Sequence, residues 1–204
     1  MKNILSLALV LFIGYTAFAQ TDEDALAEIK KHRDTQESEF RDPEKSPLEP
    51  KDRKHFKGLN FYAPDLKYRV KATFIKNEAP VLFKMKTSTS RLPEYLKYGE
   101  VHFVLDSQQY KLEVYQSPDI SKDPQYKDYL FIPFTDNTNG HETYDVGRYI
   151  DMTIPTTTEV IVDFNQCYNP YCSYRDGYSC PVPPVANALP IAIPVGEKKF
   201  REHH

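Results

Sequence analysis

The chain of 204 residues contains 26 lysine and arginine residues and 29 aspartate and glutamate residues, which gives a formal net charge of −3. So small a net charge produces no strong single-sign field, and it gives no reason to expect nucleic acid or an anionic membrane as the partner. The 15 tyrosines, 12 phenylalanines and 16 prolines, beside 7 glycines and no tryptophan, favour pleated strands joined by rigid loops over a helical bundle.

The first residues have the pattern of a cleavable secretory signal peptide. Lys2 precedes an apolar run over residues 4–13, and Ala17-Phe18-Ala19 supplies the small residues of a cleavage site. The apolar run is well under the ~20 residues that a membrane-spanning helix needs. We therefore expect residues 1–19 to be a signal peptide cleaved after Ala19. The mature protein is then periplasmic or secreted, with no membrane insertion.

Residues 20–50 are expected to form an N-terminal helix and an extended, proline-rich lead-in. From residue 22 to about residue 39 the sequence is charged and carries only a weak apolar stripe at helical spacing, made of Ala25, Leu26 and Ile29. Arg41-Asp42-Pro43 marks the end of the helix. Because the stripe offers two sizeable apolar groups, we expect the helix to contribute little to the stability of the fold.

Residues 51–204 are expected to form a single β-rich domain. Tyr68, Val70, Ala72 and Phe74 alternate with basic residues, which is typical of a strand with one buried and one solvated face. Patterns and turn signals predict strands over residues 56–62, 67–76, 80–86, 100–105, 110–115, 129–134, 144–154, 159–165 and 189–195. Short strands at hairpin spacing predict a mainly β fold, either an antiparallel sandwich or a partly closed barrel, with one N-terminal helix.

Three cysteines bear on the redox state of an exported chain. Cys172 and Cys180 bracket a short loop that a disulfide could close, whereas Cys167 lies at the end of a predicted strand. In an oxidising compartment we expect a Cys172–Cys180 disulfide. The alternative is that all three cysteines are small buried apolar side chains.

Two long motifs resemble the signatures of an uncharacterised bacterial family, the domain of unknown function sixteen eighty-four. The first runs from Leu130-Phe131-Ile132-Pro133-Phe134 to Gly147-Arg148-Tyr149-Ile150-Asp151, and the second includes Tyr168-Asn169-Pro170-Tyr171-Cys172 and Cys180-Pro181-Val182-Pro183-Pro184. The resemblance extends over about residues 39–199 and implies no activity. Cys167 departs from it, because the family pattern has a small residue such as alanine at that place.

Two polar groups share one face of the predicted strand 159–165. Asp163 and Asn165 lie opposite Val160, Val162 and Phe164. They could be ordinary surface, they could cap loops by accepting backbone N–H bonds, or they could line the rim of a pocket closed by the Asn169 loop.

Arg148 is unusual because it lies on an otherwise apolar face of the predicted strand 144–154. The other residues of that face are Tyr144, Val146, Ile150 and Met152. A guanidinium in an apolar row needs acceptors, and Asp136, Asp163 and Glu197 are the candidate partners. The pair could be structural, or its planar fork could hold a carboxylate or phosphate. The candidate ligand-binding set is therefore Asp136, Arg148, Asp163, Asn165, Asn169 and Glu197.

These patterns support two hypotheses about function. The first is a binding or structural module whose polar pocket takes a small polar or anionic ligand. The second is a hydrolase of a small or envelope-derived substrate that uses Asp163, Asp136 or Glu197 as acid or base. The histidines are scattered, and neither a metal-ligand spacing nor a glycine-rich nucleotide loop is present, so the sequence implies no cofactor and no metal and assigns no catalytic residue.

Overall fold

The structure is a computed structural model that describes residues 21–200, so the predicted signal peptide and its cleavage site after Ala19 lie outside the described residues. Two α-helices come first, α1 over Asp22–Arg41 and α2 over Pro50–Arg53. The strands follow as β1 (Arg69–Lys76), β2 (Leu82–Lys84), β3 (Glu94–Leu105), β4 (Gln108–Gln116), β5 (Tyr129–Phe134), β6 (Arg148–Thr153) and β7 (Glu159–Asp163).

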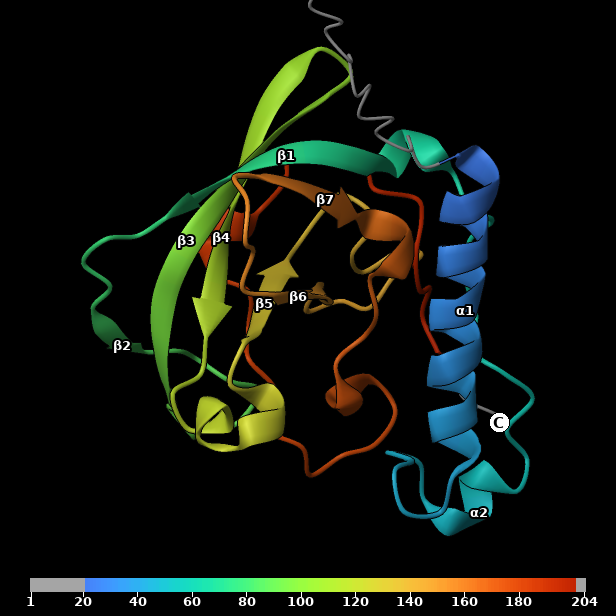
Figure 1. The fold of residues 1–204 in the computed structure, drawn as a ribbon. Helices are drawn as coiled ribbons and strands as arrows, with labels where there is room; N and C mark the ends of the chain where they lie inside the picture. Colours follow the sequence, from blue (N-terminus) through green and yellow to red (C-terminus); the bar gives the residue numbers. More distant parts are fainter. Residues whose placement is uncertain (1–20, 201–204) are drawn as a thin grey trace, which may run out of the picture.

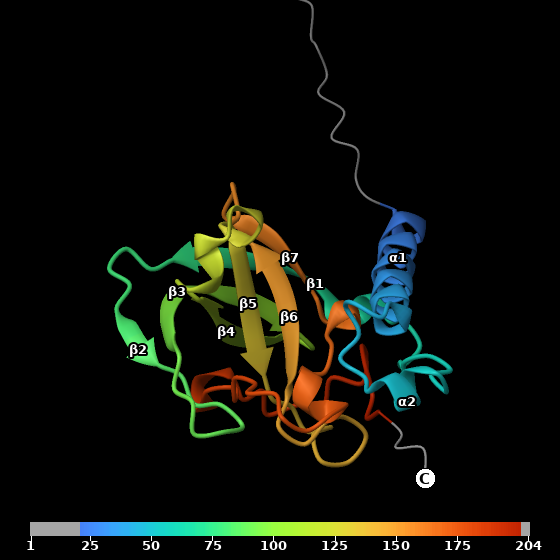
Figure 2. The ribbon, with the colours of Figure 1, turned by 90° about the horizontal axis from the view of Figure 1, so that it is seen from below.

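The strands form one antiparallel sheet in the order β6-β5-β4-β3-β1-β7, with β2 paired to β3. The sheet curls into a half-barrel, and α1 stands beside it on the side of β7 (Figure 1). The view from below shows the same curl and the same separate position of α1 (Figure 2). The prediction of a mainly β fold, a partly closed barrel with one N-terminal helix, is confirmed.

The alternating pattern explains which face of the sheet is buried. Tyr68, Val70, Ala72 and Phe74 are all buried in the core inside the half-barrel, as predicted. The β3–β4 hairpin also forms where the sequence predicts it. Its two turn residues, Asp106 and Ser107, have φ values of 50° and 62°. Such left-handed conformations are what a tight two-residue hairpin requires, although neither residue is glycine.

Two of the predicted strands, 56–62 and 189–195, are wrong. In the first segment Phe61 forms an isolated bridge with Glu197 and joins no sheet. In the second, Pro190 and Pro194 have no N–H to donate to a ladder. Leu189 and Ile191 bond to the backbone of Thr135 and Asn137. The carbonyl oxygens of Ile193 and Val195 accept from Arg148 instead, so the pattern of buried side chains is present without a strand.

Helix α1 is more extensively docked than predicted. Ala25 and Ile29 are buried, but Leu26 is 43% exposed, so its place in the predicted stripe is wrong. Phe40, beyond the predicted stripe, packs with Leu48 and Leu59. Arg33 donates to the Tyr62 carbonyl at 2.9 Å. These contacts tie the helix to the segment before β1. Within residues 21–200, neither helix is long and apolar enough to cross a membrane.

Candidate functional site

Arg148 is fully buried, and both terminal nitrogens of its guanidinium donate to internal acceptors, whereas Nε has no hydrogen-bond partner among the described residues. Nη2 donates to Asp136 Oδ2 and to the Ile193 carbonyl, both at 2.8 Å. Nη1 donates to the Val195 carbonyl at 2.5 Å and to the Glu197 carbonyl at 3.3 Å. Of the three candidate carboxylates, Asp136 is therefore the partner. Because both terminal nitrogens already donate within the protein, the guanidinium has no free fork to offer a ligand.

Asp136 also holds its own turn and the last segment of the chain. Its Oδ1 accepts from the Thr138 backbone N–H at 2.8 Å and from the Ile193 backbone N–H at 3.2 Å. The carboxylate thus satisfies two backbone donors as well as the guanidinium, which is a sufficient structural reason for its burial.

Asp163 and Asn165 cap a loop by hydrogen bonding to the backbone, which is one of the three roles that the sequence allows. Asp163 Oδ1 accepts from both the backbone and the side-chain N–H of Asn165, each at 2.9 Å. Asn165 pairs in turn with the Asp65 backbone, at 2.8 Å to its N–H and at 2.9 Å to its carbonyl. Asp163 Oδ2 lies 3.4 Å from Arg69 Nη1. These bonds attach the end of β7 to the segment that precedes β1.

Glu197 and Asn169 form a third buried unit. The Asn169 backbone N–H donates to Glu197 Oε2 at 2.9 Å, and the Tyr174 hydroxyl donates to Glu197 Oε1. Asn169 Nδ2 donates to the Lys198 carbonyl at 2.8 Å. Glu197 is fully buried, and its burial raises the pKa of its carboxyl to about 7, against the opposing effect of these bonds.

The six predicted residues therefore divide into two groups. Asp136, Arg148, Glu197 and Asn169 form one continuous network, which Arg148 joins through the Glu197 carbonyl. Asp163 and Asn165 belong to a separate network around Asp65, and no hydrogen bond among the described residues links it to Arg148. Among the six, Asn169 lines the large cavity described below. The three carboxylates named for the hydrolase hypothesis do not line it.

The raised pKa of Glu197 predicts how stability depends on pH. Its folded-state pKa of about 7 lies above the ordinary value of 4.5, so the folded protein keeps a proton that the unfolded chain releases. The resulting stability is fully present below pH 4.5 and is lost as the pH rises to about 7, on the order of 3 kcal/mol in all.

Urea unfolding at pH 5 and pH 8 measures this effect against the Glu197→Gln variant, which is permanently neutral. The loss of unfolding free energy between the two pH values should be larger in the wild type by on the order of 3 kcal/mol. Equal losses in the two proteins would mean that Glu197 does not hold its proton above pH 4.5.

A cavity of about 780 Å³ lies on the outer face of β5 and β6, between that face, α1 and the segment 168–181. The register places Phe131 opposite Asp151, while Leu130, Ile132 and Ile150 point to the core. Alternation therefore sends one set of side chains inward and the other into this cavity. Among the described residues that line it, the aromatic ones are Phe40, Tyr95, Tyr126, Tyr129, Phe131, Tyr149, Tyr168, Tyr171, Tyr174 and Tyr178. We call it the tyrosine cavity.

Asp151 is the carboxylate on the strand wall of the tyrosine cavity. It accepts from the Tyr129 hydroxyl at 2.8 Å and from the Tyr168 hydroxyl at 2.6 Å. The side chain keeps contact with water, yet protein surrounds the carboxylate closely enough that burial raises its pKa, and the bonds from Tyr168 and Tyr129 offset only part of that rise. A water-accessible carboxylate inside a concave site is a group that a ligand can reach.

Helix α1 supplies the opposite wall, with two polar atoms that lack partners. His32 Nε2 and Gln36 Oε1 are buried without a hydrogen-bond partner among the described residues, and both side chains line the tyrosine cavity. Burial lowers the pKa of His32, with Asp151 opposing, so the ring is neutral at neutral pH. Because a buried unpaired polar atom costs about 1–3 kcal/mol, a bound molecule that paired with either atom would gain that energy.

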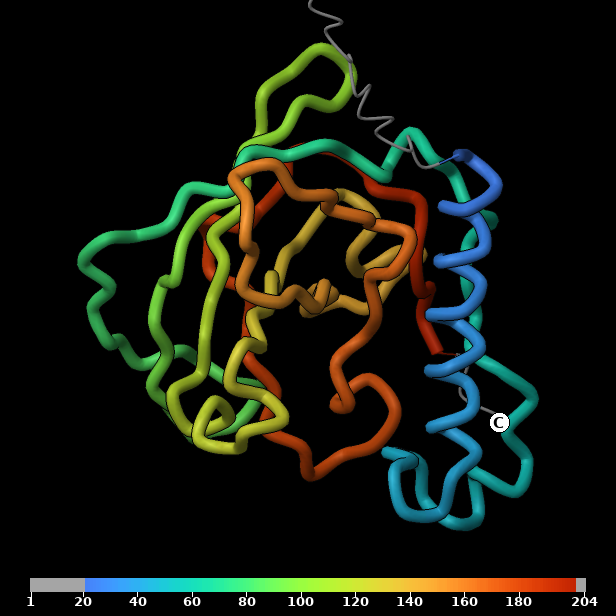
Figure 3. The backbone as a smooth tube through the Cα atoms, in the orientation of Figure 1, coloured from blue at the N-terminus to red at the C-terminus, as the bar shows by residue number. Residues whose placement is uncertain are grey.

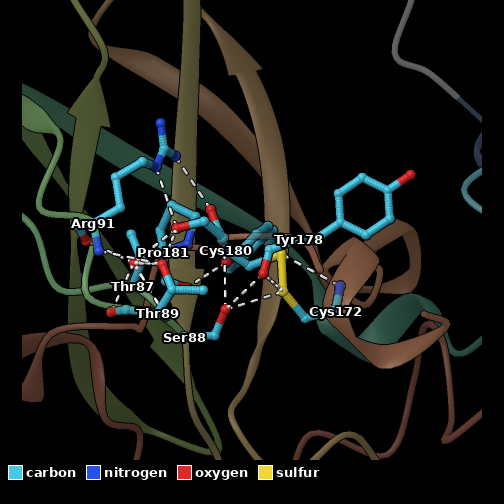
Figure 4. Close-up of a disulfide and its surroundings, with 10 residues drawn as sticks. Thr87, Ser88, Thr89, Arg91, Cys172, Tyr178, Cys180 and Pro181 are labelled. Atoms are coloured by element: carbon cyan, nitrogen blue, oxygen red, sulfur yellow. Dashed lines mark hydrogen bonds between the residues drawn. A yellow bond between two sulfur atoms is a disulfide. The ribbon is translucent and has the colours of Figure 1, made fainter. Parts of the chain in front are cut away.

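The Cys172–Cys180 disulfide closes a loop within the segment 168–181, which forms the third wall of the tyrosine cavity beside the strands and α1 (Figure 4). Its Cα atoms are 6.3 Å apart, within the range that a disulfide spans. The loop is also attached to residues 86–91: Ser88 Oγ accepts from the Cys180 N–H at 3.1 Å, and the Ser88 N–H donates to the Cys180 carbonyl at 2.8 Å. The tube view shows how residues 168–181 (orange) pass between the half-barrel and α1 and then beneath the half-barrel (Figure 3).

We predict that this disulfide forms in the folded protein and that its removal loosens the cavity wall. The double variant Cys172→Ser/Cys180→Ser should lose about 2–3 kcal/mol of unfolding free energy, because the closed loop is short. Mass spectrometry of non-reduced digests should recover a peptide that joins the two cysteines. Recovery of both as free, alkylatable thiols from protein purified under non-reducing conditions would contradict the prediction. Cys167 is the matched internal control, since it is a free thiol and fully buried.

The tyrosine cavity is not predicted from the sequence, although one part of the sequence indicates it. Four tyrosines, Tyr168, Tyr171, Tyr174 and Tyr178, fall within one short loop, a concentration that a loop does not need for its own packing. The rest of the lining comes from α1, β3, β5, β6 and the segment between β4 and β5, and only the fold brings those segments together.

Comparison with known proteins identifies the family. Residues 54–198 match the model of a family described as "Protein of unknown function (DUF1684)". A solved structure, the solution NMR structure of an uncharacterized protein of Haloarcula marismortui, is 35% identical with a TM-score of 0.68, and the alignment covers 89% of this chain and 97% of that one. No curated protein matches the sequence. A family model that matches these 145 contiguous residues, together with a structural relative at this identity, shows that the chain belongs to the DUF1684 family.

Proposed function

We propose that this protein is an exported binding module that holds a small polar molecule in the tyrosine cavity. The observation that carries the proposal is Asp151, a carboxylate that water can reach but that protein surrounds, set in a cavity of about 780 Å³. Ligand sites of small molecules have volumes of about 300–1,000 Å³, mostly apolar walls and a few polar groups that fix orientation.

The polar groups around the tyrosine cavity are placed where they can orient a bound molecule. Asp151 is held by two tyrosine hydroxyls, and facing it across the cavity are His32 and Gln36, whose unpaired atoms can donate to or accept from a ligand. Export of the protein is supported by the leader pattern of residues 1–19 and by the disulfide that forms one wall.

Thermal unfolding with a panel of small amines, amino acids, sugars and carboxylic acids tests the proposal. At 100 times its dissociation constant a ligand stabilises the folded state by about 2.7 kcal/mol. For a protein of this size that corresponds to a rise in Tm of several degrees.

Two tryptophan variants on α1 localise the effect. Thr35→Trp places a bulky ring on a residue that lines the cavity and should abolish the rise in Tm. Ser38→Trp is the matched control, because Ser38 is exposed on the same helix and does not line the cavity. The proposal fails if no member of the panel raises Tm, or if both variants respond like the wild type.

A further inference from the structure

The charges around the tyrosine cavity point to one class of ligand. Among the described residues that line it there are two carboxylates, Asp151 and Glu39, one neutral imidazole, and no lysine or arginine. An anion in this cavity would meet two negative groups and no cationic partner, whereas a cation would gain from both.

The carboxylates differ in how free they are to act on a ligand. Glu39 is exposed, and its Oε1 lies 3.8 Å from Lys45 Nζ, so the positive charge of Lys45 partly neutralises the carboxylate. Asp151 has no cationic side chain within salt-bridge distance among the described residues, and its bonds come from the neutral hydroxyls of Tyr129 and Tyr168. Its negative charge is therefore available to a molecule that enters the cavity.

The rings around Asp151 supply the second half of a cation site. Tyr149 stands at 86° to Tyr168, with ring centroids 5.9 Å apart, and at 79° to Phe131, with centroids 5.7 Å apart. These three residues line the cavity with their ring planes in different orientations, and aromatic ring faces attract cations. One ring of the loop, Tyr178, already has a cation over its face, because the Arg175 guanidinium lies 5.1 Å from the ring centroid.

We infer that the tyrosine cavity selects a small organic cation, an alkylammonium group held by the Asp151 carboxylate and the surrounding tyrosine rings. This inference rests on the proposed function and names the chemical class of the ligand. Cation–π attraction in a desolvated site and a direct charge pair each favour the cation over a neutral molecule of the same shape.

Three probes of nearly equal shape and different charge test the inference. They are choline, its neutral isostere 3,3-dimethyl-1-butanol, and the anion 3,3-dimethylbutanoate, each titrated calorimetrically into the folded protein. We expect choline to bind at least about tenfold more tightly than the neutral alcohol, and the anion to bind more weakly than either.

Asp151→Asn should reduce the preference for choline over the alcohol to within about threefold, because it removes the negative charge that favours the cation. Asp145→Asn is the matched control, because it removes an exposed carboxylate that pairs with Lys199 and does not line the cavity. Since Asn is isosteric with Asp and position 151 is reached by water, the variant should unfold at nearly the wild-type temperature. If Asp151→Asn unfolds at a much lower temperature, Glu39→Gln and the comparison of the three probes in the wild type still decide whether the cavity prefers a cation.

The outcomes separate the two claims. Equal affinity of the wild type for choline and the neutral alcohol, or tighter binding of the anion, overturns the organic cation as ligand and leaves the binding module standing. Absence of binding by all three probes, together with no response to the wider panel, overturns both.

Discussion

Replacing Arg148 by methionine is expected to lower the free energy of unfolding by about 3–5 kcal/mol, because it leaves the buried Asp136 carboxylate without its partner. The same change removes the donor to three backbone carbonyls of the last segment, those of Ile193, Val195 and Glu197. These carbonyls lie in the interior, where an acceptor without a donor is costly. Urea unfolding at constant pH measures the loss.

Arg175→Met is the matched control for this variant. Arg175 pairs with Glu49 at 3.2 Å, but both side chains are exposed by more than a third, so the pair is screened by water. The same chemical change there should alter the unfolding free energy by less than about 1 kcal/mol. Similar losses in the two variants would mean that the buried network does not hold the C-terminal segment in place.

Gly196→Ala is expected to be at least as damaging. Gly196 has φ +75°, a left-handed conformation that costs a residue with a side chain about 1–2 kcal/mol. A methyl group at this position would also collide with Cys167 Sγ, and would lie 2.8 Å from the carbonyl oxygens of Cys167 and Phe164. Two of these contacts are with backbone, which cannot move aside, so we expect a loss of about 3 kcal/mol or more.

Gly140→Ala separates backbone strain from collision. Gly140 has φ +82°, nearly the same conformation, yet nothing lies within 4 Å of the position that its methyl group would occupy. This variant should lose only the ~1–2 kcal/mol of backbone strain. Chemical denaturation of the two variants side by side measures the difference, and equal losses would show that the space around Gly196 is not closed.

The sequence predicts the sheet well because each strand carries its own evidence. The alternation of residues 67–76 and the short apolar run of residues 129–134 are local properties, and the structure places these strands as β1 and β5 with little change in their bounds. The segment 189–195 also has the pattern of a strand, but it forms none. Its buried side chains satisfy the pattern, while its prolines and the demand of Arg148 for carbonyl oxygens prevent pairing.

The candidate site was predictable only in part, because its groups are distant in sequence. The need of Arg148 for a carboxylate could be argued from its apolar row, and one of the three candidates, Asp136, meets that need. Nothing local relates Asp151 on β6 to His32 on α1, since their proximity depends on how α1 docks. Phe40 and Arg33, which anchor the helix, do not belong to the predicted stripe.

The most direct test of the organic cation site is an NMR measurement of contacts between tetramethylammonium and the tyrosine rings. We expect intermolecular NOEs from the methyl protons to the ring protons of Tyr129 and Tyr168, which donate to Asp151, and of Tyr149, which packs on Tyr168. These NOEs should be lost in Asp151→Asn. NOEs confined to rings outside the cavity, such as Tyr98 or Tyr110, would contradict the organic cation site. The absence of any NOE at a tetramethylammonium concentration that saturates known cation sites of other proteins would also contradict it.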